Sequence, residues 1–240
     1  MSVRIAATVS LLVACGGETA NQPANAPTAE SSDQAERTAH SRKGLPSVQS
    51  ELGEVDLKDA ERAFASADGA IAGCHKKGLA KIEYLAGDIG FLVRIGADGK
   101  ARYAVVESSS LGDRATERCM VDALTQTRWP VPKGGEAEAR KLLSFTPGDA
   151  REPAAWPAEK VAGTVKDKAD AVNACKKGSS AQYHVTAYVQ PSGRDGKFES
   201  IGVAASSPDA FAAADCVVDA LKSSKLPSPG SYAAKVTFDF

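Results

Sequence analysis

The sequence predicts an α+β protein built from two tandem copies of one small module. Two observations carry this prediction: the chain repeats itself, and each copy alternates apolar patterns of helical and of strand period. The 240 residues are 43% hydrophobic and 25% charged, which is typical of a globular chain. We expect each copy to have the order α-β-β-α-β, with a three-stranded antiparallel sheet and its helices on one face.

The repeat is clearest between residues 96–132 and residues 193–229, which align without a gap; of these 37 positions, 15 are identical. The tripeptide Asp98-Gly99-Lys100 returns in the second copy, and Cys119 returns as Cys216. We interpret this as an internal duplication. The predicted organisation is a signal peptide at 1–14, a disordered tether at 15–50, a first repeat at 51–149, a linker at 150–158 and a second repeat at 159–240.

The N-terminus has the features of an export signal. Arg4 supplies a positive charge, and a short, mostly apolar stretch follows it. The segment Leu12-Val13-Ala14-Cys15-Gly16 resembles the bacterial lipobox, which implies cleavage before Cys15 and lipid attachment to it. Gly16, in place of an aspartate, then favours the periplasmic face of the outer membrane. The alternative is an ordinary signal peptide with an incidental cysteine.

Residues 16–50 have the composition of a flexible tether. Only Leu45 and Val48 are large and aliphatic there, and the rest is rich in Ala, Pro, Asn, Gln, Ser and Glu. Such a segment cannot bury enough apolar surface to offset the conformational entropy of ordering. We expect this segment to connect the lipid on Cys15 to the folded part of the chain and to hold that part away from the membrane.

In the first copy, apolar residues at spacings of three and four predict a helix that ends near Gly78. Alternating residues 89–95 predict a strand, and Asp98-Gly99 predicts a tight hairpin into a second strand at 103–107. A second helix is expected at about 112–127, and a last strand at about 140–145.

In the second copy, the first helix is expected around Val161 to Cys175, and a strand alternates from Tyr183 to Val189. The hairpin is expected to turn at Asp195-Gly196. Ser207 and Pro208 are typical of a helix start, with serine as the cap and proline in the first turn. A final strand is predicted at 234–240.

Four cysteines remain after the predicted anchor, two in each copy, and export would place them in an oxidising compartment. Four cysteines allow three pairings. Because duplicated cysteines should have the same role in both copies, we predict the disulfides Cys74–Cys119 and Cys175–Cys216. The alternative is two pairs of buried free thiols.

The arrangement of a cysteine late in the first helix, an Asp-Gly hairpin and Cys-x-Val-x-x-Leu before a Pro-x-Pro segment resembles the AgmX/PglI C-terminal domain, which is similar to the C-terminal domain of TonB. The resemblance covers most of residues 60–147 and, more weakly, 165–240. It implies an envelope domain for protein–protein interaction without known catalysis. Leu226 stands where the first copy has Trp129. The residues that carry the resemblance are Cys74, Gly99, Cys119, Val121, Leu124, Trp129 and Pro130 in the first copy, and Cys175, Gly196, Cys216, Val218, Leu221 and Pro227 in the second.

Motifs of enzymes are missing from the sequence. It has no Gly-x-Ser-x-Gly elbow, His-Glu-x-x-His motif or phosphate loop, so we predict a protein that is not an enzyme and has no catalytic residue, metal site, cofactor or small-molecule substrate. His75, next to Cys74, is expected on the surface. The formal net charge of −1 argues against a nucleic-acid partner. A cryptic hydrolase site stays open as a minor alternative.

The function predicted from these features is a lipid-anchored, non-catalytic adaptor that binds an envelope protein, possibly by adding a strand of the partner to a sheet edge. The proposed edge is the terminal strand, and Trp129 is a second candidate contact, although burial is favoured for it. The alternative is a structural, self-associating envelope scaffold without a peptide ligand. The partner-binding residues predicted are Trp129, Val236, Thr237, Phe238 and Phe240.

Overall fold

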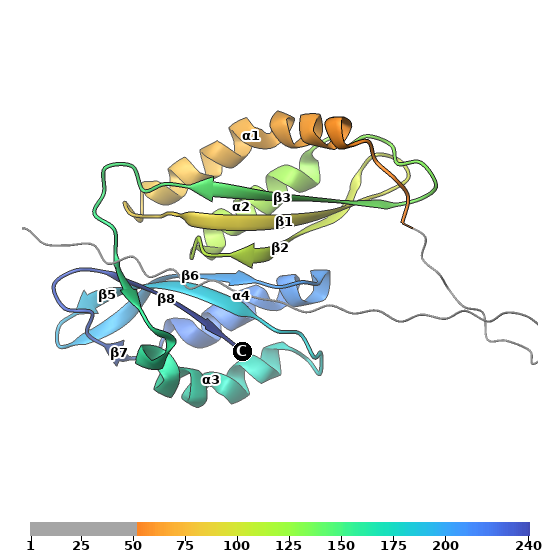
Figure 1. Ribbon diagram of the computed structural model, residues 1–240. Coiled ribbons are helices and arrows are strands. Elements are labelled where there is room, and N and C mark those ends of the chain that lie inside the picture. The colour runs from red at the N-terminus through yellow and green to blue at the C-terminus, as the bar shows by residue number, and fades with distance from the viewer. Residues whose placement is uncertain (1–51) are drawn as a thin grey trace, which may run out of the picture. The chain divides into compact units, whose positions relative to one another are not determined.

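The computed structural model describes residues 52–240, which lie within one compact unit that spans Gln49–Phe240 (Figure 1). The predicted signal peptide at 1–14, the lipidated Cys15 and the tether at 15–50 lie outside the described residues. The fold is mixed α+β, with one three-stranded antiparallel sheet, one curled five-stranded sheet and four α-helices in the described part. No helix between residues 52 and 240 is both long and apolar enough to cross a membrane.

The first module, residues 52–145, contains two helices and a hairpin followed by a third strand. Its sheet has the order β2-β1-β3, so β1 is central and both of its neighbours are antiparallel to it. The elements are α1 (Leu57–Leu79), β1 (Gly87–Ile95), β2 (Ala101–Ser109), α2 (Arg114–Gln126) and β3 (Ala137–Phe145).

Local signals in the sequence explain the boundaries of these elements. The Asp56 carboxylate accepts hydrogen bonds from the backbone N–H groups of Lys58 and Asp59, which caps the start of α1. Gly99 has a φ of 71°, a conformation that suits glycine, and it completes the turn between β1 and β2 as the sequence predicts. Ile89, Phe91, Val93 and Ile95 are buried beneath the helices, which confirms the alternation expected for this strand.

The second module, residues 154–240, forms the curled sheet of order β4-β8-β5-β6-β7. Strand β5 pairs antiparallel with β6 and β8, while β4 pairs parallel with β8. Ser207 caps α4 through the backbone N–H of Ala210, and Pro208 occupies the first turn, as the sequence predicts. The elements are β4 (Ala154–Trp156), a 3₁₀ helix (Ala158–Val161), α3 (Ala162–Cys175), β5 (His184–Ser192), β6 (Asp195–Ala204), α4 (Pro208–Lys222), β7 (Leu226–Pro227) and β8 (Ala234–Asp239).

Three sequence-based expectations for this module are wrong in detail. Its sheet has five strands with one parallel pair, where three antiparallel strands were expected, because β4 and β7 add to its edges. The hairpin turns at Gly193 and Arg194, because Ser192 pairs with Asp195 and Gly193 has the positive φ of 65°. Asp195-Gly196 instead begins β6, where it pairs with β7. The predicted linker at 150–158 contains β4, so these residues are partly an element of the second sheet.

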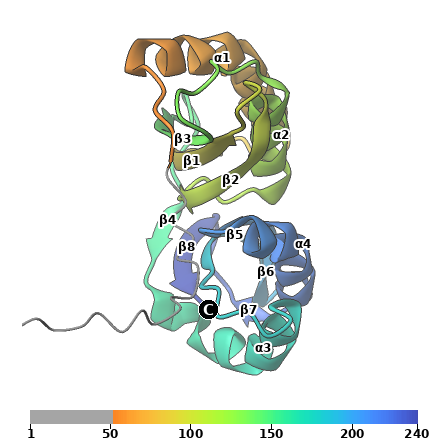
Figure 2. The same cartoon turned by 90° about the vertical axis from the view of Figure 1, so that its right-hand side faces the viewer.

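The two modules pack against each other within the compact unit. Strand β2 of the first module faces β6 of the second, where the backbone N–H of Ala205 donates to the carbonyl of Val106 at 2.8 Å (Figure 2). Strand β3 lies on the other side of β1, away from this contact (Figure 1). The β2 side of the first sheet therefore faces the second module and is joined to it by this backbone hydrogen bond.

Candidate functional site

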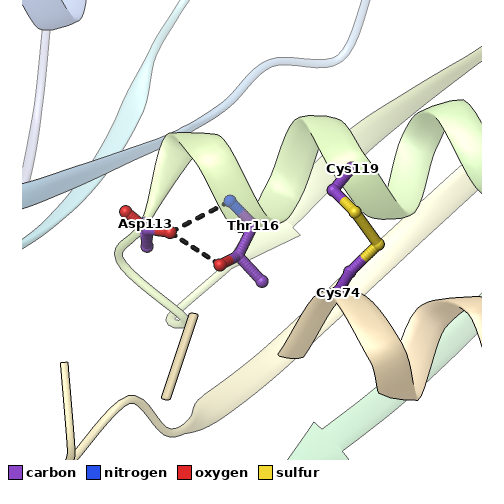
Figure 3. Close-up of a disulfide and its surroundings, with 4 residues drawn as sticks. All are labelled: Cys74, Asp113, Thr116 and Cys119. Carbon is purple, nitrogen blue, oxygen red and sulfur yellow. Dashed lines mark hydrogen bonds between the residues drawn. A yellow bond between two sulfur atoms is a disulfide. The ribbon is translucent and has the colours of Figure 1, made fainter. Parts of the chain in front are cut away.

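The disulfides in the structure are the two pairs predicted from the sequence. Cys74 on α1 bonds to Cys119 on α2, and Cys175 on α3 bonds to Cys216 on α4, each with Cα atoms 5.7 Å apart. In Figure 3 the first bridge lies about one turn beyond Thr116, whose backbone N–H and hydroxyl both donate to the Asp113 carboxylate at the capped start of α2. Each bridge ties the two main helices of its module together.

Trp129 is buried at 3% exposure, which agrees with the favoured expectation and removes it as an exposed contact for a partner. Its ring meets Phe64 edge-on at a centroid distance of 4.8 Å. Its indole N–H donates to the carbonyl of Leu124 at 3.1 Å. Trp129 therefore closes the core between α1 and the end of α2.

The prediction that the C-terminal strand is a free edge is wrong for its first half. Residues 234–236 of β8 pair with β4, so Val236 lies between two strands, and both Val236 and Phe238 are buried. Thr237 lies beyond the paired part of β4, but its hydroxyl is within 3.1 Å of the Thr186 hydroxyl on β5. Phe240 exchanges backbone hydrogen bonds with Tyr183. The sequence could not show that a strand from the predicted linker would cover this edge.

Among the edge strands of the described sheets, β3 is the longest one that is open, since β4 and β7 have only three and two residues. It pairs with β1 over all nine of its residues, and no described strand pairs with its other side. Along β1, the backbone N–H and C=O groups of even-numbered residues point toward β2; the carbonyl of Asp88, for example, accepts from the N–H of Ser110. The backbone groups of odd-numbered residues of β1 therefore point toward β3, where they bond to the odd-numbered residues of that strand. The backbone N–H and C=O groups that face outward on β3 are therefore those of Glu138, Arg140, Leu142 and Ser144.

The side chains of the same residues form a polar outer face with one exposed apolar group. Arg140 contacts Glu107 and Glu138, each at 3.0 Å. Arg94 contacts Glu138 at 3.2 Å. Leu142 stands beside these ion pairs at 63% exposure. Charged residues on an edge strand discourage indiscriminate pairing, so this edge combines free backbone groups with side chains that can select a partner.

The contact between the modules is centred on Glu117, which is completely buried. One carboxylate oxygen accepts from the Ser109 hydroxyl at 2.7 Å, and the other accepts from the backbone N–H of Val203 at 3.0 Å. Desolvation raises the pKa of Glu117, although both hydrogen bonds oppose the shift. Glu117 thus completes the hydrogen bonding of β6 from the neighbouring module.

Other contacts fix the same interface. Arg114 of α2 binds Asp215 of α4 at 2.8 Å and donates to the carbonyl of Phe211 at 2.9 Å. The Ser200 hydroxyl donates to the carbonyl of Gly112 at 2.8 Å. These bonds add to the Glu117 contacts that join the first module to the second.

A pocket of about 570 Å³ lies where the end of β3 meets β4 and β8. Its aromatic walls include Tyr84, Phe145, Trp156 and Tyr188. The Lys235 ammonium donates to the carbonyl of Ala86 at 2.6 Å, and burial lowers the pKa of this lysine. The lining therefore combines aromatic walls with the charged side chains of Glu152 and Lys235.

The two histidines of the described part lie in different settings, one buried and one paired with a carboxylate. The expectation that His75 lies on the surface is wrong, because it is 9% exposed, contacts the carbonyl of Leu85 at 2.9 Å and stacks near Phe145. His184 on β5 contacts Asp239 at 2.7 Å. Between residues 52 and 240 no group of three His, Cys, Asp or Glu residues is arranged to hold a metal ion.

Sequence reasoning missed both the open edge and the buried interface. In residues 137–145, Leu142 falls on the face of the strand that otherwise carries the polar residues Glu138, Arg140 and Ser144. This departure was a signal that the outer face of β3 is unusual, but it could not show which strand would stay unpaired. Glu117 had no distinguishing signal, because a glutamate one position before Arg118 in an amphipathic helix is normally exposed to solvent.

Comparisons with known proteins place the chain in no family: no family model, no curated protein and no solved structure matches it.

Proposed function

We propose that the chain is a lipid-anchored envelope protein that acts as a non-catalytic adaptor, and that it binds its partner by strand addition to the edge of β3. The observation that carries this proposal is a nine-residue edge with four outward-facing backbone positions and no described strand beside it. A partner strand would gain main-chain hydrogen bonds there, and Leu142 with its neighbouring ion pairs would contribute specificity.

The proposal includes the anchor and the origin of the modules. Lipid on Cys15 would hold the protein on the periplasmic face of the outer membrane, and the tether at 15–50 would act as the stalk. The matching order of helix, hairpin, helix and strand in the two modules supports an internal duplication of a TonB C-terminal-like domain of the AgmX/PglI type. Cysteine pairs at equivalent places support the same interpretation.

Proline at position 142 tests the docking site. Leu142→Pro removes one outward N–H and no bond to β1, and proline is tolerated on an edge strand at such a position. The oxidised chain from residue 16 should capture a partner from envelope extract, and Leu142→Pro should lose it while its circular dichroism stays native. Leu142→Ala keeps the N–H and serves as the matched control. Equal capture by all three proteins would remove β3 as the site.

The second candidate function is a self-associating scaffold. Two β3 edges can pair antiparallel about a two-fold axis, and the well-packed contact between the modules provides the rigidity that such a scaffold needs. Analytical ultracentrifugation distinguishes the two functions. A scaffold would dimerise at micromolar concentration through an association that Leu142→Pro abolishes, whereas the adaptor would stay monomeric without its partner.

A further inference from the structure

The two disulfides occupy equivalent places in the modules but differ in their exposure to solvent. In the second bridge Cys175 is 4% exposed, while Cys216 lies exposed on the surface of α4. In the first bridge Cys74 is 5% exposed and Cys119 is half-buried. Because a disulfide reacts only where another thiolate can reach one of its sulfurs, the second bridge is the better target.

The space beside the two bridges differs in the same sense. Both cysteines of the second bridge line a pocket of about 560 Å³, whereas those of the first line one of about 130 Å³. In the smaller pocket the Thr116 hydroxyl donates to the Asp113 carboxylate next to the first bridge (Figure 3). The repeat places Ala210 and Ala213 at these two positions in the second module, and both line the larger pocket. The replacement of two polar side chains by alanine therefore accounts for the wider access to the second bridge.

The charges of the larger pocket favour a sulfur that leaves as a thiolate. Lys176 and Lys177 directly follow Cys175 in the chain, and both line the pocket. The Lys176 ammonium lies 5.8 Å from the ring centroid of Tyr183, which belongs to the same wall. Asp209 also lines the pocket, so two lysines stand against one carboxylate. Cations beside a cysteine favour its thiolate, which speeds its departure from a disulfide.

Helix α3 depends on its bridge more than α1 depends on the first one. Helix α1 buries seven residues, whereas α3 buries only Val172 and Cys175. In the described chain no side chain caps the start of α3. Thr164 and Lys168 bond to the segment that follows α4, which fixes the earlier part of the helix. The last turn of α3 is therefore held mainly by Val172 and the bridge.

From these observations we propose that Cys175–Cys216 is a site of thiol–disulfide exchange with a protein dithiol, and that its reduction releases the end of α3. One thiolate of the dithiol attacks the Cys216 sulfur, which forms a mixed disulfide and expels the Cys175 thiolate. The second thiolate then attacks the first sulfur of the same dithiol, which closes a disulfide there and expels the Cys216 thiolate. Two electrons pass to the bridge, and the two protons that the dithiol loses end on Cys175 and Cys216. The site does not involve β3, so the proposal is independent of the proposed function.

Reduction kinetics of the oxidised chain from residue 16 test the exchange site. Reduced thioredoxin serves as the protein dithiol, an alkylating reagent stops the reaction, and mass spectrometry of the peptides measures each cysteine pair separately. The Cys175–Cys216 bridge should open at least about tenfold faster than Cys74–Cys119, at a rate proportional to the thioredoxin concentration. The first bridge is the matched control within the same molecule.

Equal rates at the two bridges, or a faster rate at Cys74–Cys119, would overturn the proposal. A rate at Cys175–Cys216 that does not depend on the thioredoxin concentration would also overturn it, because exchange would then wait for the protein to unfold.

Amide hydrogen exchange tests the release of α3. In Cys175→Ser/Cys216→Ser, the exchange rate of residues 170–175 divided by that of residues 214–221 on α4 should rise at least about tenfold over the wild type. The ratio cancels a general loss of stability, which affects both helices. The corresponding ratio for α1 and α2 should change less when serines replace the first bridge. An unchanged ratio in the second module would overturn the release of α3.

Discussion

At the scale of a single residue, Glu117 makes the stability of the protein depend on pH. Burial raises its folded-state pKa above the ordinary value of 4.5. The unfolded chain therefore loses its proton first as pH rises, and the free energy of unfolding should fall from about pH 4.5 up to the folded-state pKa. Glu117→Gln keeps an acceptor for Val203 and should remove this fall, measured by urea unfolding between pH 4 and pH 8.

Truncating the Glu117 side chain to alanine measures what its hydrogen bonds contribute to stability, apart from the effect of its charge. Glu117→Ala leaves the N–H of Val203 and the hydroxyl of Ser109 without their acceptor, and should cost about 2–4 kcal/mol at all pH values where the protein folds. Wild-type and Glu117→Gln curves that run parallel across the pH range would contradict the linkage between this carboxylate and the module interface.

At the scale of an element, the disulfides hold the helix pairs of two small cores. The first bridge closes a separation of 45 residues and the second one of 41. In the chain-entropy model, replacing either pair with serines should lower the free energy of unfolding by about 4 kcal/mol. Denaturant unfolding of the oxidised double variants measures this loss. The control is Cys15→Ser, which should leave the free energy of unfolding unchanged. A loss below about 1 kcal/mol for Cys74→Ser/Cys119→Ser would contradict the expectation.

Elements also show how far the sequence could predict this fold. The positions of helices and strands could be predicted from the spacing of apolar residues, from helix-capping residues and from the turn glycine Gly99. Each of these signals depends only on residues that are close together in the chain. The edge did not follow, because β8 is covered by β4, whose three residues have no strand pattern of their own. Strand neighbours far apart in the chain depend on tertiary packing, so the candidate site moved from β8 to β3.

At the scale of the whole molecule, the modules should unfold as one cooperative unit. A Cβ at Gly202 would meet the Cα of Gly112 at 2.8 Å and also the Glu117 carboxylate. Gly202→Ala should therefore push β6 away from the first module and cost about 1–3 kcal/mol in denaturant unfolding. Gly69→Ala on α1 meets nothing within 4 Å and should stabilise by about 0.5–1 kcal/mol. Equal stability of Gly202→Ala and wild type would contradict a closely packed interface.

The claim on which the function depends is that β3 is the docking edge, and crosslinking in the intact envelope tests it most directly. A photoreactive residue at Leu142, 63% exposed, is compared with one at Val131, which is 66% exposed and lies outside β3. We predict a crosslink to another envelope protein from position 142 and none from position 131. A crosslink from 131 alone, or from neither position, would contradict the account.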